Sequence, residues 1–263
     1  MSAAPVQADR LEHGVVLLRL CAPERRNAMT EELTAAWDRA LRELQADPSV
    51  RCVAVTGEGP VFCAGGDLSW LEDSARMSTD RLRARMLPFY RTWLRIRDLE
   101  VPTVAILNGA AVGAGLALAL ACDLRYATPE AALSMPFTSL GIHAGMASTW
   151  LLPEVAGLAV AREMLLTGRV VRGADAVQRG LVNRLFGAET LREQALEVAT
   201  TIATRAPIAT RLTKAALAGG GPASIEAALQ WESVAQPLTM VTADLREGVQ
   251  AARERRSPVF TGE

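Results

Sequence analysis

The feature that most constrains the fold is an apolar stretch in the middle of the chain, residues 106–123. Val104 and Ile106 are β-branched residues typical of a strand, and they lead into a turn rich in Gly and Ala. After that turn, no polar side chain occurs until Asp123. A helix that is apolar on every face must be buried. We therefore expect a strand, a tight turn and a helix at the centre of the molecule.

The first residues of this helix, Gly113, Ala114 and Gly115, carry almost no side chain. The first N–H groups of a helix have no partner within it, and the helix dipole is positive at that end. A ligand oxygen could therefore reach these N–H groups. Close packing of two elements would explain the same small residues, so the stretch alone leaves both interpretations open.

Charge, hydropathy and cysteine usage narrow the class of partner. The chain has 263 residues and a formal net charge of −1, so we expect neither nucleic acid nor an acidic membrane surface as a partner. The longest apolar run, residues 110–122, is too short to span a bilayer, and residues 1–10 lack a signal-peptide pattern. The four cysteines show neither metal-binding nor redox spacing. We expect a cytoplasmic protein with reduced cysteines and no metal site.

Strands and helices alternate in the first part of the chain, and helices alone follow. Strands are predicted at residues 15–18, 52–56, 104–106, 124–127 and 133–137. Helices are predicted from Thr30 to Asp47 and at residues 79–98, 161–167, 174–179, 189–205, 207–217, 224–234 and 241–253. This order predicts an α/β core in residues 1–200 and a helical cap in residues 201–263 that serves assembly.

Five motifs in succession resemble the crotonase (enoyl-CoA hydratase/isomerase) superfamily, from about Arg10 to the C-terminus. They are PERRNAM at residues 23–29, FCAGGDL at 62–68, the stretch 108–123, LTGR at 166–169 with GLVN at 180–183, and REG at 246–248 with SPVFTG at 257–262. The resemblance implies the crotonase fold, a spiral of repeated ββα units followed by the helical cap. It also implies a homotrimer or a hexamer, with the cap helices at the interfaces.

The resemblance assigns a role to two bends made of small residues. In this superfamily, two backbone N–H groups form an oxyanion hole for the thioester carbonyl of an acyl-CoA, and the matching residues are Gly66 and Ala114. Reactions at an acyl-CoA often pass through an enolate whose charge lies on that oxygen, and each preorganised donor is worth ~3–4 kcal/mol. A side chain beyond a methyl group would block the approach. Coenzyme A is then part of the substrate, and no separate cofactor is expected.

A second set of residues is expected, from the same resemblance, to contact the CoA part of the substrate. It combines backbone near the adenine and pantetheine with cationic side chains near the phosphates: Arg25, Arg26, Ala28, Ala64, Asp67, Leu68 and Lys214. Lys214 is the only lysine and is a candidate for reaching the ligand of a neighbouring subunit. A solvated loop would equally explain Arg25 and Arg26, because exposed arginine is common.

At the reacting centre, the sequence departs from the pattern of the superfamily. Its hydratases hold one water between two glutamates, the general base and the general acid, and the matching residues here are Ala117 and Phe137. Enoyl-CoA isomerases of similar fold keep the second glutamate. The aspartate of dienoyl-CoA isomerases and aryl-CoA dehalogenases would fall near Gly145. None of these three residues can transfer a proton, so the standard mechanisms are not expected.

One titratable side chain remains in the loop that the superfamily uses to line its active site, that of His143. An imidazole changes its charge near neutral pH and can act as base, acid or hydrogen-bond donor. The alternative is a loop histidine that only bonds the backbone or faces solvent. Trp70, Met77, Phe89 and Trp93 are candidates for an acyl tunnel, and core or subunit contacts would explain them equally well.

Three functions stay open, all with an acyl-CoA thioester as partner. The first is an enzyme of fatty acid metabolism, a lyase or isomerase by family, that works without the glutamates; hydrolysis, decarboxylation, C–C cleavage and isomerisation through His143 or an unplaced carboxylate all fit. The second is a non-catalytic protein that binds acyl-CoA and regulates or sequesters it. The third is a weak hydratase in which ordered water and substrate suffice.

Overall fold

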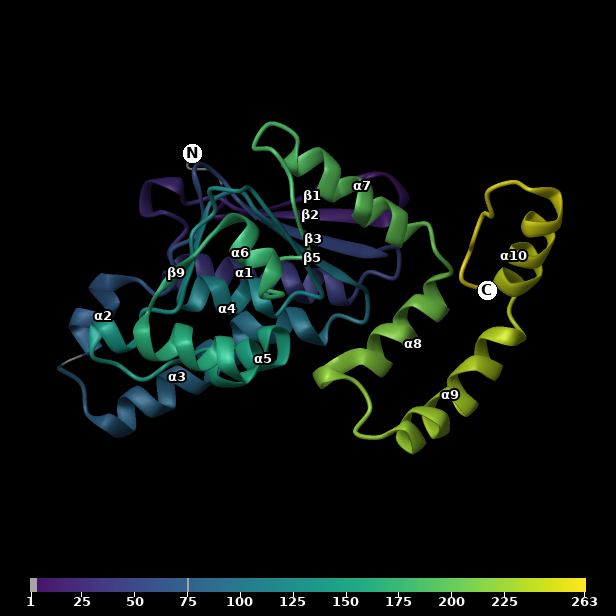
Figure 1. Cartoon of the computed structure of the whole chain (residues 1–263). Helices are drawn as coiled ribbons and strands as arrows, with labels where there is room; N and C mark the ends of the chain where they lie inside the picture. Colours follow the sequence, from purple (N-terminus) through teal and green to yellow (C-terminus); the bar gives the residue numbers. More distant parts are fainter. Residues whose placement is uncertain (1–3, 75) are drawn as a thin grey trace.

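The structure is a computed structural model that describes residues 4–74 and 76–263. At its centre lies a six-stranded sheet in the order β1-β2-β3-β5-β7-β10 (Figure 1). Its strands are β1 (Val6–Arg10), β2 (Val15–Leu20), β3 (Cys52–Gly57), β5 (Thr103–Leu107), β7 (Leu124–Ala127) and β10 (Arg184–Leu185). The pair β1–β2 is antiparallel, and all other pairs of this sheet are parallel.

A smaller sheet has the order β4-β6-β8-β9 and lies next to the larger one. Its strands are β4 (Val61–Cys63), β6 (Ala110–Val112), β8 (Leu133–Ser134) and β9 (Val170–Val171). The pairs β4–β6 and β6–β8 are parallel, and β8–β9 is antiparallel. The neighbouring strands 4, 6 and 8 thus follow the neighbouring strands 3, 5 and 7 of the larger sheet, one after another.

The chain repeats one unit three times: a strand of the larger sheet, a strand of the smaller sheet, then helix. The first unit is β3, β4, α2 (Leu68–Ser74) and α3 (Thr79–Leu94); the second is β5, β6 and α4 (Ala114–Leu120); the third is β7, β8 and α5 (Ser148–Thr167). The predicted crotonase fold, a spiral of ββα units, is confirmed by this order.

Helices cover both faces of the larger sheet, as parallel strands require. On one face, α1 (Glu31–Gln45) buries the four apolar residues predicted to share a side, Leu33, Trp37, Leu41 and Leu44. The helix begins where predicted, because the side chain of Thr30 accepts a hydrogen bond from the N–H of Leu33 at 3.1 Å. On the other face, α7 (Leu191–Ala203) packs its alanines against β3 and β5.

The central apolar stretch is buried as predicted, but its helix is shorter than expected. Residues 110–112 form the strand β6, and only Ala114–Leu120 are helical; all seven residues of α4 are buried. The expected turn is therefore partly a strand, because β4 and β8 pair with it from either side. The helix ends early because the Asp123 carboxylate accepts hydrogen bonds from the N–H and hydroxyl of Thr103, at 2.7 and 2.8 Å, which returns the chain to the sheet.

The C-terminal part is helical, as predicted. It comprises α6 (Gly173–Gln178), α7, α8 (Pro207–Leu217), α9 (Ile225–Met240) and α10 (Ala243–Glu254), and α9 and α10 lie apart from the two sheets (Figure 1). α9 buries none of its residues and exposes several apolar side chains: Ile225, Leu229, Val234 and Leu238. Within the described residues, every helix is too short or too polar to cross a membrane. The division at residue 200 and the assembly role of the cap stay predictions.

Candidate functional site

A cavity of about 1420 Å³ opens between α1, α2, α3 and the start of α4. Most of the residues predicted for the site line it: Arg25, Arg26, Ala28, Ala64, Gly66, Asp67, Ala114 and His143. Leu68, also predicted, is the first residue of α2 and follows Asp67 directly. The cavity is large enough for an elongated ligand of more than ordinary drug size.

The two bends of small residues are in close backbone contact at one wall of this cavity. Gly65 has a φ of +89°, and a Cβ there would lie 2.4 Å from the carbonyl oxygen of Val112 and 3.2 Å from the nitrogen of Ala114. A Cβ on Gly115 would lie 2.2 Å from the carbonyl oxygen of Cys63. Glycine is therefore required at both positions, because backbone meets backbone there.

Gly66 and Ala114 lie on either side of this contact, and both line the cavity. A Cβ on Gly66 would have nothing within 4 Å, so this residue borders open space. Within the described part of the chain, neither N–H is paired with a protein acceptor. Met29 holds the first bend in place, because its N–H donates to the carbonyl of Gly65 at 2.8 Å. Two residues of the cavity lining thus carry backbone N–H groups that have no protein acceptor among the described residues and little side chain around them.

The two residues predicted to match the hydratase glutamates, Ala117 and Phe137, have apolar surroundings. Ala117 is fully buried inside α4 and does not line the cavity. Phe137 does line it, and its ring lies 3.6 Å from where a Cβ on Gly113 would be. The Phe137 ring therefore lies next to the residue that precedes α4, close to the Ala114 N–H. Neither Ala117 nor Phe137 carries a group that can transfer a proton.

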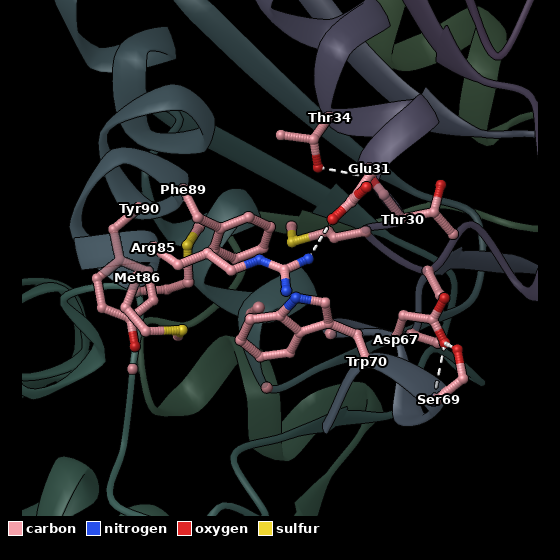
Figure 2. Close-up of a pocket in the computed structure, with 18 of the residues that line it drawn as sticks. Thr30, Glu31, Thr34, Asp67, Ser69, Trp70, Arg85, Met86, Phe89 and Tyr90 are labelled. Atoms are coloured by element: carbon pink, nitrogen blue, oxygen red, sulfur yellow. Dashed lines mark hydrogen bonds and ion pairs between the residues drawn. The ribbon is translucent and has the colours of Figure 1, made fainter. Parts of the chain in front are cut away.

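Several other carboxylates that line the cavity are held in ion pairs. Asp67 accepts from Arg25 at 2.6 Å and from the hydroxyl of Ser69 at 2.8 Å. Glu31 pairs with Arg85, and Figure 2 shows the Arg85 guanidinium between the Glu31 carboxylate and the indole of Trp70. Ion pairs or hydrogen bonds therefore already occupy oxygens of both carboxylates.

The loop with the two predicted arginines is built on a buried asparagine. The amide of Asn27 donates to the carbonyls of Glu58 and Val61, at 3.0 and 2.8 Å, and its oxygen accepts from the N–H of Ala22 at 2.9 Å. Both Arg26 and Asn27 have left-handed backbone, with φ of 54°. These bonds hold the loop rigid while the side chains of residues 25 and 26 stay exposed at the cavity.

His143 lines the cavity with an exposed side chain. Its Nδ1 lies 2.7 Å from the carbonyl oxygen of Ala144. Since a carbonyl can only accept, Nδ1 carries the hydrogen, and in a neutral ring Nε2 is left as an acceptor. The geometry thus permits His143 to take a proton, and it equally fits a histidine that bonds the backbone.

The aromatic candidates separate into two groups. Trp70, Met77 and Phe89 line the cavity, and the rings of Trp70 and Phe89 stack at 6.3 Å between centroids. Trp93 is fully buried against Trp37, at 5.1 Å between centroids, so it belongs to the core.

Sequence reasoning missed four cavity residues on α3, namely Arg85, Met86, Tyr90 and Thr92. Helical spacing could have revealed residues 85 and 86. Residues three or four apart lie on one face of a helix, so these two share the face of Phe89. The Arg85 guanidinium lies 4.9 Å from the centroid of the Trp70 ring, a cation–π distance.

Lys214 is not brought to this cavity. Its Nζ lies 2.9 Å from the Asp123 carboxylate and 2.8 Å from the carbonyl of Val101, and it joins α8 to the central stretch. Its predicted contact with CoA therefore finds no support within one protomer.

Among the described residues, no group of three or more His, Cys, Asp or Glu side chains is arranged to hold a metal ion.

The fold is a ββα spiral, and its cavity is lined by the two bends of small residues that contain Gly66 and Ala114. Residues 10–263 match the family model described as enoyl-CoA hydratase/isomerase. The chain belongs to this family, and hence to the crotonase superfamily that its motifs resemble.

Individual relatives agree with this assignment. The 1,2-epoxyphenylacetyl-CoA isomerase of Escherichia coli K12 is 34% identical over 97% of both chains. Among solved structures, an enoyl-CoA hydratase from Bacillus anthracis superposes with a TM-score of 0.92 at 33% identity, over 98% of this chain and 100% of that one. An enoyl-CoA hydratase from Polaromonas sp. JS666 reaches 0.90 at 30% identity, over 97% and 99%.

Proposed function

We propose that this chain is an acyl-CoA enzyme that polarises the thioester carbonyl between the N–H groups of Gly66 and Ala114. The observation that carries the proposal is the pair of unpaired backbone donors on the cavity wall. Such donors stabilise an oxyanion without having to reorganise, and one of them is typically worth ~3–4 kcal/mol in the transition state. Coenzyme A enters only as part of the substrate in this proposal.

The CoA part is proposed to lie along Ala64 and Asp67, with Arg25 and Arg26 near its phosphates. Both arginines are exposed at the cavity, on a loop that Asn27 holds in place. Arginine binds phosphate oxygens with paired N–H groups, and the exposed pair at residues 25 and 26 suits that role. A phosphate would compete with Asp67 for the Arg25 guanidinium, now 2.6 Å from that carboxylate.

The reaction we propose is not glutamate-dependent hydration of an enoyl-CoA. The apolar contacts of Ala117 and Phe137 support this choice, since they leave the water site without acid or base. Isomerisation fits the carbonyl-polarising wall, and the name of the E. coli relative is that of an acyl-CoA isomerase. Hydrolysis or decarboxylation with His143 as the proton-handling group is the second candidate, supported by its acceptor Nε2 at the cavity.

We also propose how the protein assembles and where it is located. The exposed apolar side chains of α9 support a homotrimer or hexamer built through the cap, because contiguous apolar surface marks interaction sites. The four free cysteines fit the reducing cytoplasm.

The test combines one activity and one binding measurement on the same sample. Crotonyl-CoA hydration is followed by absorbance, and butanoyl-CoA binding by calorimetry. We expect binding without hydration at family rates. Ala114→Pro removes one donor, and proline is tolerated at the first position of a helix, so the fold should persist while affinity falls about tenfold. Fast hydration would refute the choice of reaction, and absence of binding would refute the site.

A separate variant tests the proposed role of His143. His143→Ala leaves the two backbone donors intact, so butanoyl-CoA binding should persist. If His143 handles protons, turnover of whichever CoA thioester the wild type converts should fall by about 100-fold or more. Unchanged turnover would remove His143 from the mechanism and leave it as a loop histidine.

A further inference from the structure

Tyr90 brings a hydroxyl group into the cavity that nothing described so far employs. The residue lies on α3, near its C-terminal end, and is partly buried. Among the residues that the structure describes, its hydroxyl makes no hydrogen bond. Burial raises the pKa of the phenol, so Tyr90 stays neutral and keeps its O–H as a donor at physiological pH.

The position of this hydroxyl is set by a glycine on the opposite loop. A Cβ on Gly145 would lie 2.6 Å from the Tyr90 oxygen and 3.1 Å from its Cζ, and no other residue comes as close. The phenol oxygen thus occupies the space that a side chain at residue 145 would need. Any residue larger than glycine there would displace the hydroxyl, so the pair Tyr90 and Gly145 is matched in shape.

The surroundings of the hydroxyl are apolar. Phe89 meets the Tyr90 ring edge-on at 6.1 Å, and Met86, Phe137 and Met146 line the same part of the cavity. Among the described residues, the hydroxyl has no protein partner and is not fully buried, so it stays open to the cavity. A ligand oxygen at this end of the cavity can therefore accept its hydrogen bond in place of water.

The direction of the ligand places its acyl group at this end. Figure 2 shows Tyr90 and Met86 on one side of the close-up and Asp67 and Ser69 on the other. Under the proposed function, CoA lies along Asp67 and the thioester carbonyl is held at Ala114. The acyl group then extends away from Asp67, toward the side of Tyr90.

We propose that Tyr90 is a specificity-determining residue whose hydroxyl donates a hydrogen bond to an oxygen on the acyl group, beyond the thioester carbonyl. The substrates are then acyl-CoA thioesters with an oxygen function on the acyl chain, and unsubstituted alkanoyl-CoA is a poorer ligand. This inference rests on the proposed function, because it needs the thioester to lie in this cavity.

The test compares the affinity of butanoyl-CoA with that of its 3-hydroxy and 4-hydroxy derivatives by calorimetry. In the wild type, at least one hydroxylated thioester should bind about tenfold more tightly than butanoyl-CoA, the usual effect of one well-formed hydrogen bond. In Tyr90→Phe the difference should shrink to less than about twofold. Gly145→Ala should abolish the preference as well, although it leaves the phenol in the chain.

The chain offers a matched control, because it has two tyrosines. Tyr126 lies in β7, stacked on Phe186 at 5.4 Å, and does not line the cavity. Tyr126→Phe removes the same atom and should keep the preference. It also leaves Tyr90 as the only tyrosine, so that tyrosinate absorbance reports it alone; the preferred thioester should shift that titration further toward alkaline pH.

The outcomes separate the two proposals. Equal binding of all three thioesters by the wild type, or a preference that survives in Tyr90→Phe, overturns the role of Tyr90 and leaves the proposed function standing. Binding of none of the thioesters overturns both. A preference lost equally in Tyr126→Phe would show a general loss of structure and would also overturn the specific role.

Discussion

Replacing Gly65 or Gly66 with alanine adds the same methyl group, but the surroundings of these two adjacent residues differ. At Gly65 the φ is +89° and the new Cβ would lie 2.4 Å from the carbonyl oxygen of Val112. At Gly66 the Cβ would have nothing within 4 Å and would project into the cavity. The first change acts on the fold and the second on the ligand.

The expected magnitudes follow from these contacts. Left-handed backbone costs a residue with a Cβ about 1–2 kcal/mol, and overpacking costs about 1–3 kcal/mol more. Gly65→Ala should therefore lower the free energy of unfolding by about 3 kcal/mol and the melting temperature by about 6–12 °C. Gly66→Ala should change stability by less than about 0.5 kcal/mol. Its methyl group takes up cavity space next to the proposed carbonyl position, so butanoyl-CoA should bind about tenfold more weakly.

Two calorimetric measurements test these expectations. A thermal scan reports stability, and a titration with butanoyl-CoA reports binding. Gly220 provides the control, because it has the same φ of +89° as Gly65 but nothing within 4 Å of its Cβ. Gly220→Ala should show only the conformational cost, about 1–2 kcal/mol. The reasoning fails if Gly65→Ala is no worse than Gly220→Ala, or if Gly66→Ala either melts early or binds like the wild type.

Three further outcomes are expected. Lys214→Met should lower the melting temperature by several degrees, because the Asp123 carboxylate loses a charged partner at 2.9 Å; no change would mean that the contact adds nothing in solution. The hydrogen bonds of Arg256 and of the Val259 N–H lower the pKa of Glu247 from 4.5 to about 2, so this carboxylate stabilises the fold above about pH 4.5 and the effect is lost as the pH falls toward 2. The protection of the Val259 amide, measured as its exchange rate relative to the intrinsic rate at each pH, should fall over that interval, and protection that does not change would contradict the role of Glu247. Burial raises the thiol pKa of the three buried cysteines to about 12, so Ellman's reagent should label only Cys21 in the native protein.

Patterns that repeat within one element were predictable from the sequence. The buried face of α1 follows from apolar residues at helical spacing, and its first residue from the capping side chain of Thr30. The burial of α4 follows from its lack of polar side chains. The two bends beside it were found because small residues cluster there, which local composition is enough to reveal.

Contacts between distant segments were not predictable in this way. Residues 110–112 carry the sequence Ala-Ala-Val, which suits a strand or a helix, and their pairing with β4 and β8 decides the outcome. The approach of Tyr90 to Gly145 depends on how α3 packs against a loop of the third ββα unit. The ion pair of Lys214 depends likewise on where α8 crosses the central stretch. Tertiary packing determines each of these.

The same division explains how one wall of the cavity can stay constant while its chemistry changes. The two donors are backbone N–H groups, and their positions depend on contacts such as that of Gly65 with Val112, which tolerate no added atom. The positions predicted to match the hydratase glutamates are side chains, and an alanine or a phenylalanine at residues 117 and 137 is compatible with the fold. In the proposed function, carbonyl polarisation is therefore tied to folding, whereas the choice of acid, base or specificity group is not. A hydroxyl from α3 can thus supply the polar contact to the acyl group, because Tyr90 reaches the cavity without altering the backbone donors.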